Sequence, residues 1–278
     1  MDFKFFPPHR KLSQHIVGYV YWNDFVKYRK EILFTVKGTG SLGIPLNSDF
    51  KCAVKGRKLK NNCLSKLEPI IPVLYGQMTS YGKVMVEGHV QLIFVVFTPL
   101  GLYSFLKGDA SLVTDSIIPL DSLNEIFRNF EFNQGDPIED NLICLEQVLF
   151  HGFEAKGNQD YEFPLSSTIE YLLKHQGKST VQELADLAGV STRTLELKFK
   201  KYVGLTPKTY SRVIRFNALI KQFSESSLKD SCDWVEKYGY TDQSHLIKDF
   251  KDFTGMSPGK YFKNPSIDDS MLNKSISK

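Results

Sequence analysis

The sequence predicts an α+β protein in which a β-rich first part is followed by an all-α second part. The first part holds short runs of β-branched and aromatic residues bounded by Gly, Pro and Asn, which are typical of strands. The second part shows helical periodicity and signals for helix ends. One pattern occurs twice there, namely glycine, a helix, Gly-x-x-Pro and a tyrosine. The 278 residues leave room for two domains, each with its own core.

The first domain is expected over residues 1–150 and consists mainly of strands. Its longest predicted strand covers residues 83–97, where apolar residues at even positions from Val84 to Phe94 give one buried face. Gly88 interrupts this alternation and is expected to mark a bulge or a bend. The other predicted elements are strands at 16–22, 31–36 and 51–56 and helices at 121–130 and 138–150.

The second domain is expected over residues 164–265 and contains about seven helices. A linker without periodicity precedes it, and a polar tail follows it. The Ser167–Glu170 and Thr180–Glu183 pairs both fit the capping box, in which a hydroxyl precedes a glutamate by three residues at a helix start. The remaining boundaries are the linker at 151–163, helix-turn-helix motifs at about 181–202 and 231–253, a connecting helix at about 207–223 and the tail at 266–278.

The duplicated pattern has a spacing of 51 residues after the turn and 50 before it, so the second copy has one extra residue in its turn. The turn glycines Gly189 and Gly239 lie 50 residues apart. Two copies are too few for a repeat solenoid, so we expect the duplication to serve another purpose. The pairs that lie 51 residues apart are Leu195/Leu246, Phe199/Phe250, Lys200/Lys251, Gly204/Gly255, Pro207/Pro258 and Tyr210/Tyr261.

Each copy fits a helix-turn-helix motif, in which two short helices cross closely. In the first copy, Ala185 is small enough for close contact, and Gly189 suits the left-handed turn that ends the first helix. Ser191 is placed to cap the second helix. The pairs expected to face the core are Leu195 with Phe199 and Leu246 with Phe250.

The outward faces of these second helices carry residue types that bind DNA. A helix fits the major groove, and side chains from its N-terminal part reach base edges. Arg and Lys favour guanine, Gln suits adenine, Glu accepts from cytosine, and an apolar side chain packs on the thymine methyl group. The residues expected to hold phosphates, which position the protein without specifying sequence, are Lys198, Lys200, Lys201, Arg212, Lys251 and Lys260.

The charge distribution leaves an alternative open. Residues 165–278 hold 18 Lys and Arg against 13 Asp and Glu, whereas the other residues hold 17 against 18. The positive excess therefore belongs to the duplicated part. The charged faces also fit the solvated surface of an ordinary helical bundle, and a single copy would not separate the two interpretations. Two copies in register favour DNA binding.

The segments ELADLAGVSTRTLELKFKKYVGLTPKTY and WVEKYGYTDQSHLIKDFKDFTGMSPGKYF, joined by RVIRFNALI, resemble the DNA-binding domain of the AraC/XylS family of bacterial transcription regulators. The resemblance implies sequence-specific DNA binding, with two motifs entering successive major-groove segments about 10 base pairs apart. It also implies contact with RNA polymerase or its occlusion. Carried over by position, the base contacts are Arg193, Glu196, Leu197, Gln243, Ser244, His245, Ile247 and Lys248.

Leu197 departs from the pattern of this family, which usually has arginine at that position. Loss of the guanidinium removes a group that reads guanine or holds phosphate. The departure implies that the first motif reads an A·T-rich half-site or contributes less affinity than the second.

Residues 8–130 resemble, less specifically, a domain often attached to this family, through LSQHIVGYVYW, VLYGQMTSY and FTPLGLYSFL. Such domains are commonly cupin-like β-barrels that bind an effector or mediate dimerisation, and this implies a regulatory role by analogy. The aromatic residues that either line an effector pocket or form ordinary core are Tyr19, Tyr21, Trp22, Tyr75, Tyr81, Phe94 and Phe97.

Other motifs indicate no chemistry. GTGSLG at 38–43 fits a dinucleotide fingerprint, but Pro45 forbids the helix that would hold a pyrophosphate, so a turn between strands is favoured. Glu87 and His89 alternate as metal ligands do, but no second histidine completes a site, and a hydrogen-bonded or surface pair is favoured. With no catalytic arrangement, we expect no enzyme activity, no cofactor and no metal.

The sequence favours a cytoplasmic protein. No apolar run reaches the roughly 18 residues that span a bilayer, the N-terminus lacks a signal-peptide pattern, and the four cysteines have no C-x-x-C spacing. The expected partners are double-stranded DNA and RNA polymerase, with a small-molecule effector and a homodimer left open and no membrane. The alternative function is a small-molecule-sensing or metabolic β-barrel protein whose helical tail mediates protein contacts.

Overall fold

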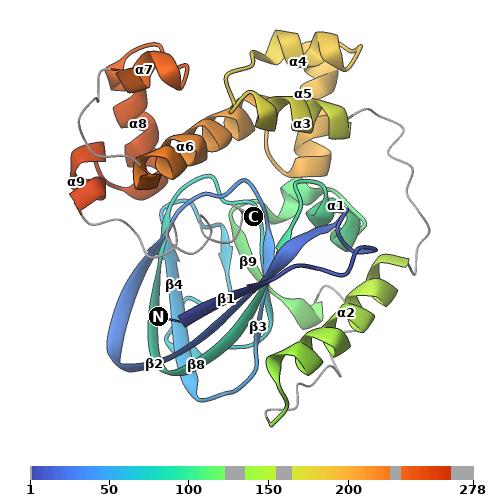
Figure 1. Cartoon of the computed structure of the whole chain (residues 1–278), viewed down its shortest axis with the longest axis vertical. Helices are drawn as coiled ribbons and strands as arrows, with labels where there is room; N and C mark the ends of the chain where they lie inside the picture. The colour runs from blue at the N-terminus through green and yellow to red at the C-terminus, as the bar shows by residue number, and fades with distance from the viewer. Residues whose placement is uncertain (1, 123–134, 155–164, 226–232, 264–278) are drawn as a thin grey trace.

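The computed structural model describes residues 2–122, 135–154, 165–225 and 233–263. A curved sheet fills one half of the molecule, and a layer of helices covers one end of the sheet (Figure 1). The α+β class is thereby confirmed. Most of the predicted linker, the predicted tail and most of the predicted helix at 121–130 lie outside the described residues.

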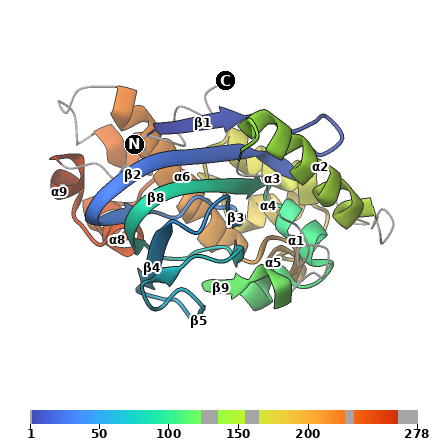
Figure 2. The same ribbon diagram turned by 90° about the horizontal axis from the view of Figure 1, so that it is seen from below.

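The sheet has nine strands among the described residues, in the order β1-β2-β8-β3-β7-β9-β5, with β4 paired to β6 and β8. Figure 2 shows β1, β2 and β8 side by side, with α2 lying next to them. These strands pair antiparallel, whereas β5 and β9 are parallel. The strands are β1 Asp2–Phe6, β2 Ile16–Phe34, β3 Ser41–Pro45, β4 Phe50–Gly56, β5 Asn61–Asn62, β6 Glu68–Pro69, β7 Val73–Tyr75, β8 Gly82–Phe97 and β9 Ser116–Pro119.

The long strand β2 joins two strands that the sequence predicts separately. Its polar stretch in the middle remains in the sheet because β8 pairs with β2 along nearly its whole length. The register between β2 and β8 shifts between Val26 and Lys30. Gly88 lies opposite Val26, and its φ of 108° is a conformation that glycine adopts readily and other residues rarely do. The irregularity expected at Gly88 is therefore confirmed.

The sheet has apolar packing on both faces, which differs from the single buried face predicted for residues 83–97. One face, including Ile93 and Val95, packs against α1 and α2. The other face, including Val86 and Leu92, closes over the inside of the curved sheet. The helices of this part are α1 Gly101–Leu106, α2 Ile138–Glu154 and the 3-10 helices η1 Ala110–Val113 and η2 Leu120–Ser122.

The second part contains the predicted helices with their order and spacing. Seven are described from residue 165 on, as expected. The capping box of Thr180 and Glu183 is present, but Ser167 lies inside a helix that includes Leu165, so the Ser167 cap is wrong. The helices are α3 Leu165–Lys174, α4 Val181–Leu187, α5 Thr192–Val203, α6 Pro207–Glu225, α7 Asp233–Lys237, α8 Gln243–Thr254 and α9 Pro258–Lys263.

Helix α6 joins two groups of helices, α3–α5 at one end and α7–α9 at the other (Figure 1). Leu195 and Phe199 of α5 are fully buried in the first group. Leu246 and Phe250 of α8 are buried in the second, against α6. The inward faces predicted for both helices are confirmed, and the glycine turns at Gly189 and Gly239 both have φ of 66°. Each group is thus a helix-turn-helix with its own small core.

Candidate nucleic-acid interface

Helix α5, the second helix of the first motif, begins with the Ser191 cap that the sequence predicts. The Ser191 hydroxyl oxygen accepts from the backbone N–H of Thr194 at 3.1 Å. Arg193, Glu196 and Leu197 are all exposed, and Leu197 keeps 63% of its surface in solvent. An apolar side chain this exposed on a capped helix is available to a partner surface.

Helix α8 has the same design with a different cap. The carboxylate of Asp242 accepts from the backbone N–H of His245 at 2.8 Å. Sequence reasoning missed this role, although an aspartate before an apolar run is a cap signal. Gln243, Ser244 and Lys248 are exposed, whereas His245 and Ile247 are half-buried. We call α5 and α8 the recognition helices.

The lysines expected at phosphates fall into two groups. Lys200, Lys201, Lys251 and Lys260 are exposed. Lys198 is half-buried, and its ammonium lies over the ring of Tyr202, 5.8 Å from the centroid. The four exposed lysines thus have the solvent access that a phosphate contact requires.

Arg212 is held within the protein and does not fit the phosphate role expected for it. Its Nε and one terminal nitrogen donate to Asp249 at 3.0 and 2.7 Å, and the same terminal nitrogen donates to Asp252 at 3.1 Å. Burial lowers the pKa of Arg212, but the hydrogen bonds and charges of the two carboxylates outweigh it and raise the pKa above its ordinary value. Arg212 therefore fastens α6 to α8, and we remove it from the set of phosphate contacts.

The sheet part contacts the C-terminal end of each recognition helix. At α5, the Thr114 hydroxyl donates to the carbonyl oxygen of Gly204 at 2.7 Å. At α8, the Ser80 hydroxyl donates to the carbonyl oxygen of Asp252 at 2.8 Å, and the ring of Tyr81 lies where a side chain at Gly255 would project. The N-terminal ends of both helices, where the exposed base-contact candidates cluster, point away from these contacts.

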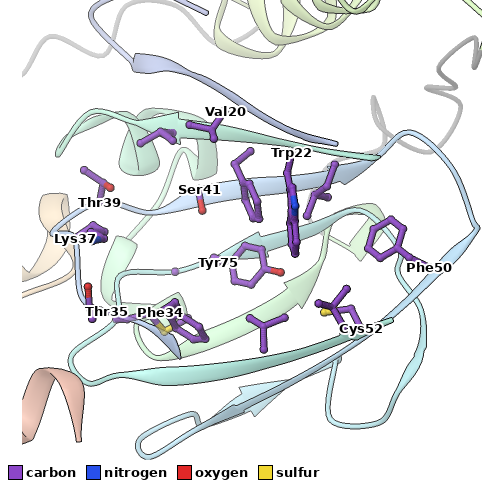
Figure 3. Close-up of a pocket in the computed structure, with 17 residues that line it drawn as sticks. Val20, Trp22, Phe34, Thr35, Lys37, Thr39, Ser41, Phe50, Cys52 and Tyr75 are labelled. Carbon is purple, nitrogen blue, oxygen red and sulfur yellow. The ribbon is translucent and has the colours of Figure 1, made fainter. Parts of the chain in front are cut away.

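A cavity of about 190 Å³ lies inside the curved sheet (Figure 3). Trp22 and Tyr75 extend into it, and Phe94 also lines it, as expected for three of the aromatic residues. The indole Nε1 of Trp22 is buried without a hydrogen-bond partner among the described residues. Burial raises the pKa of the Tyr75 hydroxyl well above its usual value, so the group is a neutral donor.

The other aromatic candidates lie elsewhere. Tyr19, Tyr21 and Phe97 pack on the opposite face of the sheet, in the core beneath α1 and α2. The Tyr19 hydroxyl donates to the Glu146 carboxylate of α2 at 3.0 Å. Tyr81 belongs to the contact with α8. None of these four residues lines the cavity, so the core alternative holds for Tyr19, Tyr21 and Phe97. Neighbouring positions of a strand face opposite sides of the sheet, and Tyr81 precedes β8.

The metal alternative gains no support from the neighbours of Glu87 and His89. Glu87 pairs with Arg29 at 3.4 Å, and His89 contacts the Asn23 side chain at 3.2 Å. Within the described residues, no three His, Cys, Asp or Glu side chains lie close enough to hold a metal ion. Among those same residues, no helix has the length and apolar character to cross a membrane.

Two models of known domains match different parts of the chain. A model of a helix-turn-helix domain matches residues 184–264, and a model of a domain of unknown function matches residues 4–119. Among solved structures, ToxT from Vibrio cholerae O395 is similar, with 13% identity and a TM-score of 0.43 over 87% of this chain and 97% of that one.

Two curated relatives cover shorter stretches. An AraC-like transcription regulator of Streptomyces antibioticus is 35% identical over 102 residues, which are 36% of this chain and 33% of that protein. An uncharacterized HTH-type transcriptional regulator of Haemophilus influenzae is 27% identical over 164 residues, which are 58% of this chain and 49% of that protein. The chain therefore spans between a third and a half of the length of these relatives. Residues 184–264 thus match a helix-turn-helix domain, and part of the chain is similar to an AraC-like transcription regulator.

Proposed function

We propose that this chain is a sequence-specific DNA-binding transcription regulator that inserts both recognition helices into successive major-groove segments. The observation that carries the proposal is the pair of capped helices with exposed, partly basic outer faces, each built on its own core and joined by α6. The caps fix the start of each helix, and side chains from the N-terminal part of such a helix reach base edges.

The proposed base contacts are divided between the two helices. Arg193, Glu196 and Leu197 belong to α5; in α8, the exposed Gln243, Ser244 and Lys248 are the main candidates, and the half-buried His245 and Ile247 lie beside them. The proposed phosphate contacts are Lys198, Lys200, Lys201, Lys251 and Lys260.

Selection of bound sequences from a random duplex pool, with the full chain, tests this function. We expect a bipartite site and an affinity that falls steeply with salt. Lys248→Ala should relax preference at particular base pairs, with a loss of about 1–3 kcal/mol at each base that Lys248 reads. Lys174→Ala removes the same charge from α3 and is the matched control, with no expected change in preference. A chain that shows no salt-dependent retention on DNA would favour the protein-contact role for the helical part.

We also propose that a small molecule in the cavity modulates DNA binding. The support is the apolar lining of the cavity, which includes the Trp22 indole and the Tyr75 ring that extend into it. The fluorescence of the neutral probe N-phenyl-1-naphthylamine should increase and saturate as the native chain is added. Val84→Phe fills the cavity from β8 and should abolish the enhancement without changing the thermal midpoint by more than a few degrees. Equal enhancement in both proteins would place the probe elsewhere.

Three further features of a regulator remain predictions. We expect contact with RNA polymerase or its occlusion at the promoter, and work in the compartment that holds the target DNA, the cytoplasm. Homodimer formation is open, because two motifs on one chain suffice for a bipartite site. The relatives with matching helices are named as regulators, and no enzyme activity is proposed.

A further inference from the structure

The end of β4 and the turn that follows it carry four basic residues and no acidic one. We call residues 55–60, KGRKLK, the basic turn. Lys55, Arg57, Lys58 and Lys60 are all exposed. The turn belongs to the sheet part of the chain, outside the helix-turn-helix domain, and none of the sequence motifs assigns it a role.

The basic turn is held firmly in place. Leu59 packs against the core on the inner face of the sheet. The backbone N–H of Lys60 donates to the carbonyl oxygen of Asp115 at 2.7 Å, and that of Arg57 donates to the carbonyl oxygen of Tyr81 at 3.4 Å. The apolar anchor and the backbone bonds hold the backbone that carries the four basic side chains, so its position is set by the fold.

Arg57 reaches the second recognition helix. Its guanidinium lies 3.1 Å from the carboxylate of Asp252, with the Arg57 side chain 52% and the Asp252 side chain 22% exposed. Asp252 already accepts from Arg212. Because Arg212 also pairs with Asp249, the two arginines together balance the two carboxylates, and half of the Arg57 side chain remains exposed to solvent.

A groove of about 500 Å³ lies beside the contact between Arg57 of the basic turn and α8. Arg57 forms one wall, and the outer face of α8 forms the other, including Ser244, Lys248 and Lys251. Three cations therefore face one groove, and Asp252, the carboxylate in its lining, is paired. Three of the α8 residues in its lining, Ser244, Ile247 and Lys248, are proposed base contacts, which places Arg57 of the basic turn beside the helix face that would enter DNA.

We infer that the basic turn is a third DNA contact, which binds the sugar-phosphate backbone beside the segment occupied by α8. This rests on the proposed function. A helix in the major groove emerges next to a phosphate strand, and the groove between α8 and Arg57 has the positive lining that such a strand requires. The contact carries affinity without sequence preference, because it touches no base edge.

The test compares two full-length triple variants with the same change in charge. Arg57→Ala, Lys58→Ala and Lys60→Ala together remove three of the four basic side chains of the basic turn. Lys4→Ala, Lys27→Ala and Lys30→Ala remove three exposed lysines on β1 and β2. Affinity for a selected duplex is measured over a range of salt concentrations. The first variant should bind about tenfold to a hundredfold more weakly, and its salt slope should fall by about 0.9 for each phosphate that it no longer neutralises. The second should bind within about twofold of the native chain.

Preserved base preference is part of the expected result. The weakened variant should select the same sequence, and Arg57→Lys alone should retain most of the affinity, because an ammonium still holds a phosphate. Thermal melting of each variant shows that the weaker binding is not due to unfolding.

Two outcomes overturn the inference. Unchanged affinity and salt slope would mean that the basic turn does not touch DNA. Tighter binding would mean that it obstructs the duplex. A native chain that binds no DNA would overturn the proposed function itself, and this result differs from either outcome for the variants.

Discussion

Leu197 shows what a single residue contributes to the interface. Its position on α5 is outward, it keeps 63% of its surface exposed, and Arg193 and Glu196 are its exposed neighbours. The family resemblance would place an arginine there. An exposed leucine adds nothing to the stability of the isolated fold, because its apolar surface stays in water. It contributes free energy only when a bound partner covers it.

Replacing Leu197 by arginine should strengthen DNA binding. The guanidinium adds a donor fork for phosphate or guanine, so the affinity at low salt should rise about tenfold and the salt slope should steepen by about 0.9. Binding titrations at several salt concentrations measure both quantities. Leu197→Gln, which is polar without charge, is the control. Equal behaviour of the two variants would mean that position 197 does not reach the duplex.

The role of a residue can be inferred from the sequence where the signal is local. Ser191 is identifiable as a cap from its position alone, and so is the Thr180–Glu183 box. Arg212 is not interpreted correctly, because its partners Asp249 and Asp252 are 37 and 40 residues away. A charged residue has the same appearance in a sequence whether it faces solvent or a buried carboxylate.

At the scale of elements, the caps of the helices control the recognition surface. Thr180 caps α4, which carries no proposed base contact, and Asp242 caps α8. Glu183 is the second residue of the capping box, and hydrogen bonds from the backbone and the hydroxyl of Thr180 lower its pKa. Both caps satisfy backbone N–H groups that would otherwise lack partners.

Removing either cap should cost similar stability but have different effects on DNA binding. Thr180→Ala and Asp242→Ala should each lower the free energy of unfolding by about 1 kcal/mol. Only Asp242→Ala should weaken base preference, because the first turn of α8 frays. Asp242→Asn keeps the cap and should behave like the native chain. Urea unfolding and sequence selection measure the two effects, and a loss of preference in Thr180→Ala would contradict the assignment.

Helices are predicted more accurately than strands for a physical reason. Helices α5 and α8 end at Val203 and Thr254, one residue beyond the expected ends of the two motifs at 202 and 253, because caps, glycine turns and apolar spacing all act locally. The short strands β5, β6 and β7 are absent from the sequence-based expectation. Two or three residues form a strand only because partners distant in sequence, such as β9 and β4, supply hydrogen bonds.

The faces of the sheet explain the mixed outcome for the pocket. Trp22, Tyr75 and Phe94 line the cavity, whereas Tyr19 and Tyr21 lie on the opposite face. Strand β2 is apolar on both faces at this point, since α2 covers one of them and the curved sheet encloses the other. A two-sided apolar strand has no alternation from which its inner face could be deduced. Whether the sheet is cupin-like stays a prediction.

At the scale of the whole molecule, the sheet part and the helices share one set of contacts. Val36 belongs to the same core as Phe216 and Phe250. The Asn217 side chain donates to the carbonyl oxygen of Lys37 at 3.2 Å. The C-terminal ends of both recognition helices, at Gly204 and Gly255, also contact the sheet part of the chain.

Removal of one buried donor at this boundary should be measurable. Thr114→Val deletes the hydroxyl and leaves the buried carbonyl of Gly204 without it, at a cost of about 1–3 kcal/mol. Amide exchange at the end of α5 should accelerate, whereas α8 should keep its protection. Thr39→Val, with Thr39 half-buried on the cavity wall, is the matched substitution. Uniform acceleration throughout the chain would indicate general destabilisation instead.

Met78 has a consequence that reaches beyond either half of the chain. Its side chain lines the cavity and packs against both the inner core of the sheet and the core that supports α8. A long, unbranched thioether side chain can change its conformation, but any such change alters its packing against both cores. A molecule bound in the cavity would therefore contact the same methionine that packs against the core beneath α8.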